Sequence, residues 1–169
     1  MINVILLTLL AAVVVLRVFF FFPVRVRGSS MDPTLRDGDL MLVRRTRRFR
    51  RRDVVICHYP KRWRTKKMHL IRQQFVKRVI GLPGETIEIR DGLIYINGSL
   101  IREHYLDPNH NRHPRDLPPR KLGPQEYFVF GDNRDISHDS RRIGPIRANM
   151  LIGRVFYRFS LTDNVNEAL

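Results

Sequence analysis

Cysteine is almost absent from this 169-residue sequence, in which Cys57 is the single example. One cysteine can form no disulfide within the chain and has no cysteine partner for a zinc site. Cys57 lies in the apolar run VVICHY, which predicts a small buried hydrophobic side chain. Its neighbour His58 would point to the opposite face of a strand, so a Cys–His catalytic pair is not expected.

Acidic residues are also scarce, because 16 Asp and Glu stand against 31 Lys and Arg, for a formal net charge of +15. Such an excess predicts contact with polyanions, either nucleic acid or an anionic lipid surface. The basic residues are densest in runs 44–52 and 61–69. Since an apolar segment precedes them, we expect membrane phospholipids as the partner and no nucleic acid. The alternative is that both runs are solvated loops.

Charge is missing from residues 2–16, an apolar run that resumes after Arg17 as VFFFFPV. A membrane-spanning helix needs about 20 apolar residues, and an arginine near its end can extend to the interface. The basic start and small-residue cleavage site of a secretory signal peptide are not evident. We therefore predict a short membrane anchor and interfacial segment over 1–22, followed by one extramembrane domain over 23–169.

Helix signals are weak beyond this segment and no internal repeat is visible, whereas strand signals recur. Apolar, β-branched runs that predict strands occur at 40–43, 53–59, 126–131 and 151–160. Segment 85–101 alternates in polarity and is broken by Asp-Gly at 91–92 and Asn-Gly at 97–98, which predicts a three-stranded meander. Residues 103–124 read as a surface loop or reduced excursion. Together these signals predict a mainly β, antiparallel core that follows an N-terminal apolar anchor helix.

Two segments offer a candidate nucleophile and base. In GSSMDPTLRDGD (28–39), small residues before Ser30 and a proline after it favour a turn that presents a hydroxyl and a free N–H. In FVKRVIGLPGE (75–85), Lys77 or Arg78 shares a strand face with apolar residues. A desolvated lysine loses proton affinity and can act as a general base. The alternatives are an ordinary turn serine and two charges on an edge strand.

A third segment, FGDNRDISHDSRRIG (130–144), crowds charged and hydroxyl side chains into a short stretch. This density predicts a buried hydrogen-bonded network that holds something in place. The alternative is an exposed loop whose charges pair among themselves.

Taken in this order, the three segments resemble the signature boxes of type I signal peptidases. SSMDPTLRDGD is similar to the nucleophile box, RVIGLPGE with its preceding lysine to the general-base box, and GDNRDISHDSRRIG to the third box. The resemblance runs from about Pro23 to Gly153 and implies that family's antiparallel β catalytic core.

The resemblance implies a role for each matching residue. Ser30 matches the nucleophile, Lys77 the general base, and Ser137 the serine that hydrogen-bonds and orients the lysine amine. The bracing ion pair and the structural part of the last box are matched by Asp139, Arg141, Asp132, Asn133 and Arg134. The Ser30 N–H would donate to the oxyanion. Gly28 stands where some members carry a second, hydroxyl donor, a departure that other branches share.

The resemblance also implies shallow apolar pockets for small side chains at the first and third positions before the cut, the Ala-x-Ala rule. The matching residues are Val24, Val26, Met31, Leu35, Phe75 and Val76. For each of them the alternative is a plain core residue.

The implied activity is that of a membrane-bound serine endopeptidase, which removes signal peptides from exported preproteins through an acyl-enzyme, with no cofactor and no metal. The resemblance places the chain in the cell inner membrane as a single-pass protein, with its catalytic domain on the extracytoplasmic side. Basic residues after the anchor (Arg17, Arg25, Arg27) favour the opposite orientation, but three motifs outweigh so few charges.

Three other interpretations remain open. A mitochondrial inner-membrane protease subunit has similar length and a single anchor. The self-cleaving repressors related to LexA use Ser/Lys chemistry, but they carry a DNA-binding domain where this chain has an apolar segment. A catalytically inactive, basic, membrane-tethered binding protein would use the +15 charge alone.

Overall fold

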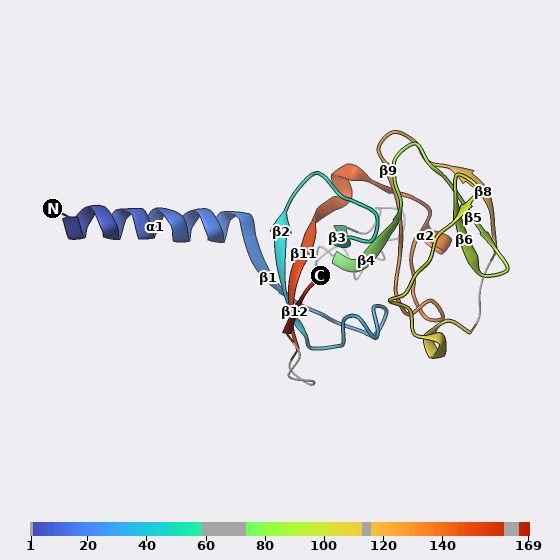
Figure 1. Ribbon diagram of the computed structural model, residues 1–169, viewed down its shortest axis with the longest axis horizontal. Coiled ribbons are helices and arrows are strands. Elements are labelled where there is room, and N and C mark those ends of the chain that lie inside the picture. Colours follow the sequence, from blue (N-terminus) through green and yellow to red (C-terminus); the bar gives the residue numbers. More distant parts are fainter. Residues whose placement is uncertain (1, 59–73, 113–115, 161–165) are drawn as a thin grey trace, which may run out of the picture.

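The computed structural model describes residues 2–58, 74–112, 116–160 and 166–169, except for the side chains of 2–3 and 16–19. A long N-terminal helix projects from a β domain that contains the rest of the described chain (Figure 1). The basic run 61–69 lies outside the described residues.

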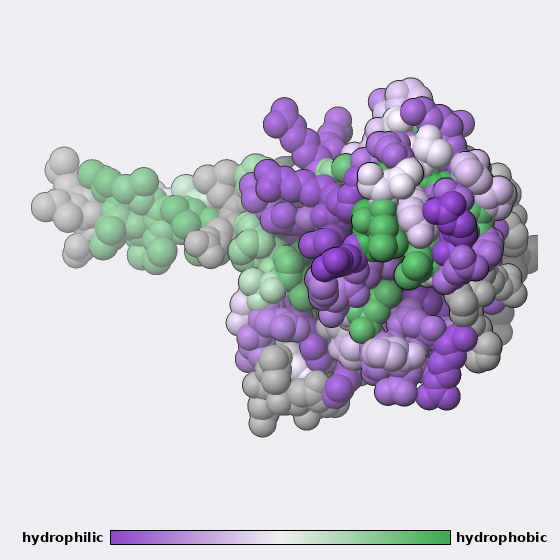
Figure 2. Space-filling view, turned by 45° about the vertical axis from the view of Figure 1, so that its right-hand side comes forward, coloured by the Kyte–Doolittle hydropathy of each residue, from purple (hydrophilic) through white to green (hydrophobic). Residues whose placement is uncertain are grey.

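Helix α1 (Ile2–Phe20) is built from the apolar run noted in the sequence. Its described side chains are exposed, and in Figure 2 this apolar helix contrasts with hydrophilic side chains on the β domain. Within the part of the chain that the structure describes, no helix combines the length and the hydropathy that a membrane crossing requires. The predicted single-pass transmembrane helix is therefore not confirmed. Residues 21 and 22, expected as an interfacial segment, begin the first strand instead.

The main sheet holds eight strands, and each pair in it is antiparallel. In spatial order they are β1 (Phe21–Arg25), β2 (Leu40–Arg45), β11 (Leu151–Phe159), β3 (Val54–His58), β4 (Gln74–Gly81), β9 (Glu126–Phe130) and β10 (Ile146–Arg147), with β12 (Asn166–Ala168) paired to β11. The strands predicted at 40–43, 53–59, 126–131 and 151–160 are β2, β3, β9 and β11.

A smaller four-stranded sheet contains the predicted meander. Its order is β7 (Ser99–Leu100), β6 (Leu93–Ile96), β5 (Thr86–Arg90) and β8 (Leu117–Lys121). Strand β8 falls inside 103–124, the segment predicted as a surface loop or reduced excursion, in which no strand was expected from the sequence. Its sequence LPPRK contains two prolines, which lack the N–H that a central strand donates, and β8 accordingly lies at the sheet edge.

Short helices complete the described chain. They are η3 (Pro108–His110), α2 (Ser140–Ile143) and η4 (Ala148–Met150). The helix α2 begins directly after Asp139, whose carboxylate accepts a hydrogen bond from the Arg141 N–H. A capping carboxylate satisfies donors that a helix start leaves free, so Asp139 has a local structural role besides any role in the site.

Strand β4 lies between β3 and β9 and faces three apolar clusters. Phe75 and Val79 pack into one cluster, Val76 borders a second, and Ile80 belongs to a third. Lys77 and Arg78 are 3% and 8% exposed, so the alternative of two edge-strand charges is wrong. Cys57 is fully buried in the first cluster, as predicted, and burial raises the pKa of its thiol.

Candidate active site

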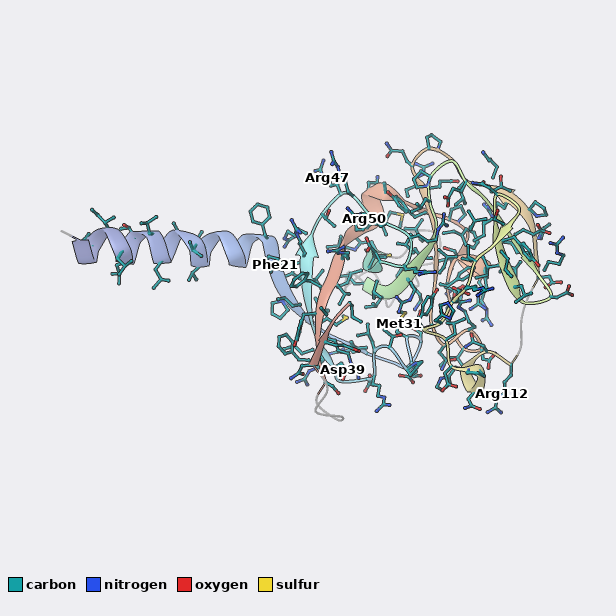
Figure 3. All side chains as sticks on the ribbon, in the orientation of Figure 1. Phe21, Met31, Asp39, Arg47, Arg50 and Arg112 are labelled. Atoms are coloured by element: carbon teal, nitrogen blue, oxygen red, sulfur yellow. The ribbon has the colours of Figure 1, made fainter. Side chains whose placement is uncertain are left out.

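Ser30 lies in the loop between β1 and β2, and backbone hydrogen bonds close the base of this loop. The Val26 N–H donates to the Asp39 carbonyl oxygen at 2.8 Å, and the Gly38 N–H donates to Val26 at 3.1 Å. Met31, immediately after Ser30, is 1% exposed, so its side chain fixes the loop to the domain (Figure 3). The sequence prediction of a turn is confirmed, and the core holds that turn in place.

Lys77, on β4, brings its amine to the Ser30 hydroxyl although 47 residues separate them in sequence. The Lys77 Nζ donates to Ser30 Oγ at 2.5 Å and to the Val76 carbonyl oxygen at 2.8 Å. The Phe75 ring centroid lies 5.7 Å from the same nitrogen. The structure thus brings together the two residues predicted as nucleophile and base, with Lys77 buried and Ser30 partly exposed.

Burial sets the protonation of Lys77. Removal from water penalises the ammonium form, and it lowers the pKa of Lys77 from 10.5 to about 8. The Asp139 carboxylate acts in the opposite direction, because a negative charge stabilises the ammonium. Burial outweighs that attraction, so a substantial fraction of the amine is neutral near physiological pH and can accept a proton.

The predicted ion pair between Asp139 and Arg141 is present and buried. Arg141 donates from Nε and Nη2 to the two carboxylate oxygens at 2.9 and 2.8 Å, and the Gly131 N–H donates to Oδ2 at 3.0 Å. Burial alone would raise the pKa of Asp139, but these donors outweigh it and hold the pKa below its ordinary value. Asp139 therefore stays ionised beside the lysine. The third segment forms the predicted buried network, and the alternative of an exposed, self-paired loop is wrong.

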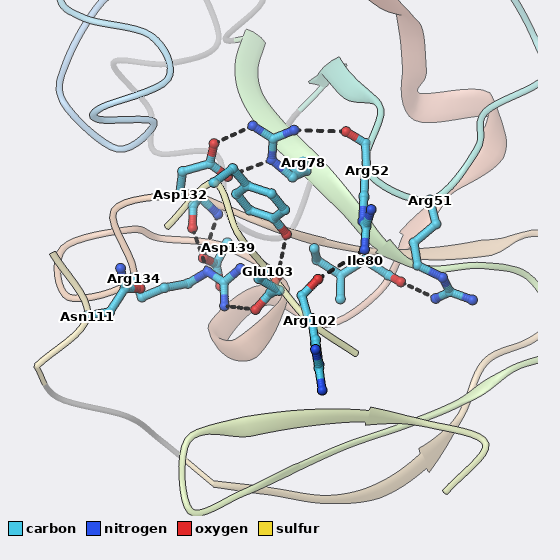
Figure 4. Close-up of polar contacts among 12 residues, drawn as sticks. Arg51, Arg52, Arg78, Ile80, Arg102, Glu103, Asn111, Asp132, Arg134 and Asp139 are labelled. Carbon is cyan, nitrogen blue, oxygen red and sulfur yellow. Dashed lines mark hydrogen bonds and ion pairs between the residues drawn. The ribbon is translucent and has the colours of Figure 1, made fainter. Parts of the chain in front are cut away.

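A second buried ion pair joins all three segments. Arg78 donates from Nε to Asp132 Oδ1 at 2.9 Å and from Nη2 to Oδ2 at 2.6 Å (Figure 4). Thr34, four residues after the nucleophile, donates to Asp132 Oδ2 at 2.5 Å and accepts from Arg78 at 3.2 Å. Asp132 was predicted as a structural residue, whereas Arg78 and Thr34 were missed. The sequence signal for Arg78 was its place beside Lys77, since neighbours on a strand face opposite sides.

The segment after the meander covers this pair. Arg134 forms two hydrogen bonds with the Glu103 carboxylate, at 2.6 and 2.9 Å, and the Tyr105 hydroxyl donates to the same carboxylate. The Tyr105 ring lies 4.0 Å from the Arg78 guanidinium carbon, a stacking contact. Burial, together with the Glu103 charge, raises the pKa of Tyr105. Both partners lie in the predicted 103–124 loop and were missed, because no sequence periodicity marks them.

Ser137 and Asn133 lie beside the nucleophile without contacting the lysine amine. Ser137 is 2% exposed, and its hydroxyl helps to lower the pKa of the Asp139 carboxyl, whereas no hydrogen bond joins it to the Lys77 amine. The predicted hydrogen bond from Ser137 to Lys77 is therefore not formed in this structure, and its orienting role stays a prediction. The Asn133 N–H donates to the Ser30 carbonyl oxygen at 3.2 Å, which ties the third segment to the nucleophile turn.

The predicted pocket residues differ in burial. Val26, Met31 and Leu35 are 0–3% exposed in one apolar cluster, Val24 and Val76 border that cluster half-buried, and Phe75 belongs to another. Side chains as buried as the first three serve the core, so contact of these six residues with a substrate stays a prediction. Among the described residues, no group of three or more His, Cys, Asp or Glu side chains is arranged to hold a metal ion.

Comparisons with known proteins agree with this geometry. The chain matches the family model of signal peptidase, peptidase S26, over residues 1–160. It is 39% identical over 160 residues to signal peptidase I of Bacillus licheniformis, which covers 86% of this chain and 81% of the relative. Signal peptidase I T of Bacillus subtilis strain 168 is 38% identical, with 86% and 78% covered. A crystal structure of a signal peptidase I from Enterococcus faecalis V583 matches with a TM-score of 0.51 and 31% identity, over 64% of this chain and 97% of that one.

Proposed function

Because the chain belongs to the signal peptidase family, peptidase S26, we propose that it cleaves signal peptides from preproteins with Ser30 as nucleophile and Lys77 as general base. The observation that carries this assignment is the 2.5 Å hydrogen bond between the Lys77 amine and the Ser30 hydroxyl, in a site that lowers the pKa of the amine to about 8. A base must lie within hydrogen-bond reach of the proton it removes and must be free of that proton at working pH. The hydrogen bond supports the first condition, and the lowered pKa supports the second because it raises the neutral fraction of the amine.

In the first step the neutral Lys77 amine takes the Ser30 hydroxyl proton while Oγ attacks the carbonyl carbon of the scissile bond. The negative charge passes to the carbonyl oxygen, and the Ser30 N–H supports it, since this N–H donates to no acceptor in the described chain. Gly28 carries no hydroxyl, and its own N–H donates to Asp37 Oδ1 at 2.6 Å, so it offers no second donor in this conformation.

In the second step the tetrahedral intermediate collapses, the C–N bond breaks, and the Lys77 ammonium returns its proton to the leaving amine. The signal peptide remains as an ester on Ser30. A water molecule, deprotonated by the again neutral Lys77, then attacks the ester carbonyl; the bond to Ser30 Oγ breaks, Oγ takes the proton from the Lys77 ammonium, and the signal peptide leaves with a free carboxyl group. A preference for small residues before the cut, as in Ala-x-Ala, is part of this proposal and is supported by Val24 and Val76, which are half-buried at the border of an apolar cluster and so keep part of their apolar surface open.

The same proposal includes a membrane location, with the catalytic domain on the extracytoplasmic side. It is supported by helix α1, whose described side chains between residues 4 and 15 are apolar or uncharged and exposed. Exposed apolar surface on this scale is stabilised by lipid. Retention of the full chain in the membrane pellet after alkaline carbonate extraction is expected, and release into the supernatant would contradict it.

The decisive experiment is cleavage of a purified preprotein with an Ala-x-Ala site by the full chain in detergent. We expect Ser30→Ala and Lys77→Ala to leave the preprotein uncut. Ser29→Ala is the matched control, because it removes the neighbouring hydroxyl, whereas the Lys77 amine donates to Ser30 Oγ. Near-normal cleavage by either dyad variant would exclude this mechanism, and uncut preprotein with every protein would favour an inactive binding protein.

A further inference from the structure

A hollow of about 780 Å³ opens where helix α1 meets the β domain. Its lining combines two kinds of side chain. The apolar part includes Phe20, at the end of α1, and Ile152 on β11. The polar part carries the hydrogen-bond donors of Arg45, Thr46, Arg47, Gln125 and Asn149. The residues that line the hollow all lie outside the three catalytic segments, and none of them belongs to the site described above.

The arginines at this hollow lack acidic partners. Run 44–52 contains seven arginines and no Asp or Glu. Within the described residues, the Arg45 guanidinium lies 4.7 Å from the Phe22 ring centroid and pairs with no carboxylate, and Arg47 is exposed and likewise unpaired with an acid. Arg51, by contrast, pairs with Glu85 at 2.5 Å. No carboxylate among the described residues therefore pairs with the two arginines at the hollow.

The turn that carries these arginines is fixed to the domain. Phe49 is 7% exposed and packs edge-to-face on Tyr127, with ring centroids 5.8 Å apart. The Arg48 N–H donates to Thr46 Oγ1 at 3.1 Å, and the Arg50 N–H donates to Asp53 at 2.8 Å. Because the backbone is held in this way, the exposed arginines occupy defined positions before any ligand arrives, and less entropy is lost on binding.

We propose that this hollow binds the phosphate-bearing headgroup of an anionic phospholipid. Arg47 projects on the side of the domain from which α1 extends, as Figure 3 shows. Lipid held by the apolar helix therefore presents its headgroups at this level. Guanidinium groups bind phosphate oxygens through paired hydrogen bonds, and the apolar wall suits the glycerol and the first acyl carbons. The inference rests on the membrane association proposed for α1, but it does not depend on the Ser30 chemistry.

Nucleic acid would also satisfy a positive surface, but the structure favours lipid. A nucleic-acid backbone needs a charged track that follows successive phosphates, often with stacking aromatic faces. Here the exposed aromatic side chain that lines the hollow, Phe20, belongs to the apolar helix itself. A phospholipid would explain both the exposed apolar surface of the helix and the unpaired arginines next to it.

The test uses the full chain in neutral detergent micelles, titrated with dihexanoyl phosphatidylglycerol or, as the neutral counterpart, dihexanoyl phosphatidylcholine. Each arginine near an anionic surface contributes about fivefold to binding, so Arg45→Gln with Arg47→Gln should weaken phosphatidylglycerol binding roughly 25-fold. Arg90→Gln with Arg120→Gln is the matched control, because it removes the same charge from exposed positions in the small sheet. Titration calorimetry measures the binding of each lipid to each variant. Added salt should weaken the preference of the wild type for phosphatidylglycerol over phosphatidylcholine.

We expect the wild type and the control variant (Arg90→Gln with Arg120→Gln) to prefer phosphatidylglycerol over phosphatidylcholine. The variant of the hollow (Arg45→Gln with Arg47→Gln) should lose this preference. Equal loss in both double variants would show a diffuse effect of net charge and overturn the site. So would an unchanged preference in the hollow variant, or stronger binding of a single-stranded oligonucleotide through the same two arginines. Ser30→Ala should keep the wild-type preference, so failure of the proposed catalysis would be seen separately in the preprotein assay.

Discussion

The lowered pKa of Lys77 predicts how cleavage depends on pH. With a pKa of about 8, roughly one tenth of the amine is neutral at pH 7 and about one hundredth at pH 6. At the ordinary value of 10.5 the neutral fraction at pH 7 would be about 3 in 10,000, so burial raises the active fraction roughly 300-fold. We expect kcat/KM to rise about tenfold per pH unit up to pH 8 and then to level off.

The perturbation that tests the cause is Phe75→Ala. The Phe75 ring lies 5.7 Å from the amine and is 8% exposed, so its removal admits water beside Lys77. The pKa of the amine should then rise from about 8 toward 10.5, which moves the midpoint of the pH profile upward and lowers cleavage at pH 7. At high pH the rate of the variant should reach a plateau of its own, and the midpoint reports the pKa of the base whatever the height of that plateau.

The assay is the initial rate of preprotein cleavage at low substrate concentration between pH 6 and pH 10.5, where kcat/KM reports ionisation of the free enzyme. Phe49→Ala is the matched control, since Phe49 belongs to the same apolar cluster and is 7% exposed. It should lower stability while the midpoint stays near pH 8. A wild-type midpoint near 10.5, or equal midpoints for the two variants, would refute the argument that burial by this ring tunes the base.

Two further predictions concern stability and close packing. Lys77→Met should raise the free energy of unfolding at pH 7 by about 1–2 kcal/mol, because about 3 kcal/mol of desolvation cost outweighs two lost hydrogen bonds. Because the pKa of Lys77 is lower in the folded than in the unfolded state, the wild type gains stability as pH rises from about 8 to 10.5. The stability advantage of Lys77→Met, measured by urea denaturation, should therefore shrink over this range. An advantage that stays constant with pH would exclude a cost of burying the charged amine. Gly131→Ala should abolish cleavage, because a Cβ would overlap Ser137 Oγ and the Ser30 carbonyl oxygen. Gly123→Ala, whose Cβ would meet its nearest atom at 3.3 Å, should cleave normally, and equal rates for the two variants would contradict this packing.

The strands that the sequence predicted correctly share a local cause. Alternating apolar residues and Asp-Gly or Asn-Gly turns act within a few residues, and the meander of β5, β6 and β7 formed as these signals indicated. Strand β8 was missed because its two prolines oppose a strand locally, while pairing with β5, about 30 residues earlier, supplies the tertiary reason for it. Contacts at that separation leave no periodic trace in the sequence.

By itself the sequence determined the chemistry that this chain has available: one serine in a turn, one lysine in an apolar strand, and a polar segment that follows them. Only the tertiary structure decided which groups meet. It placed the Lys77 amine beside the Ser30 hydroxyl and paired Arg78 with Asp132. It also brought Glu103 and Tyr105, from a segment without sequence periodicity, into the same network. The physical reason is that proton affinity and ion pairing depend on burial and on distances of a few ångströms, and these are properties of the packed chain.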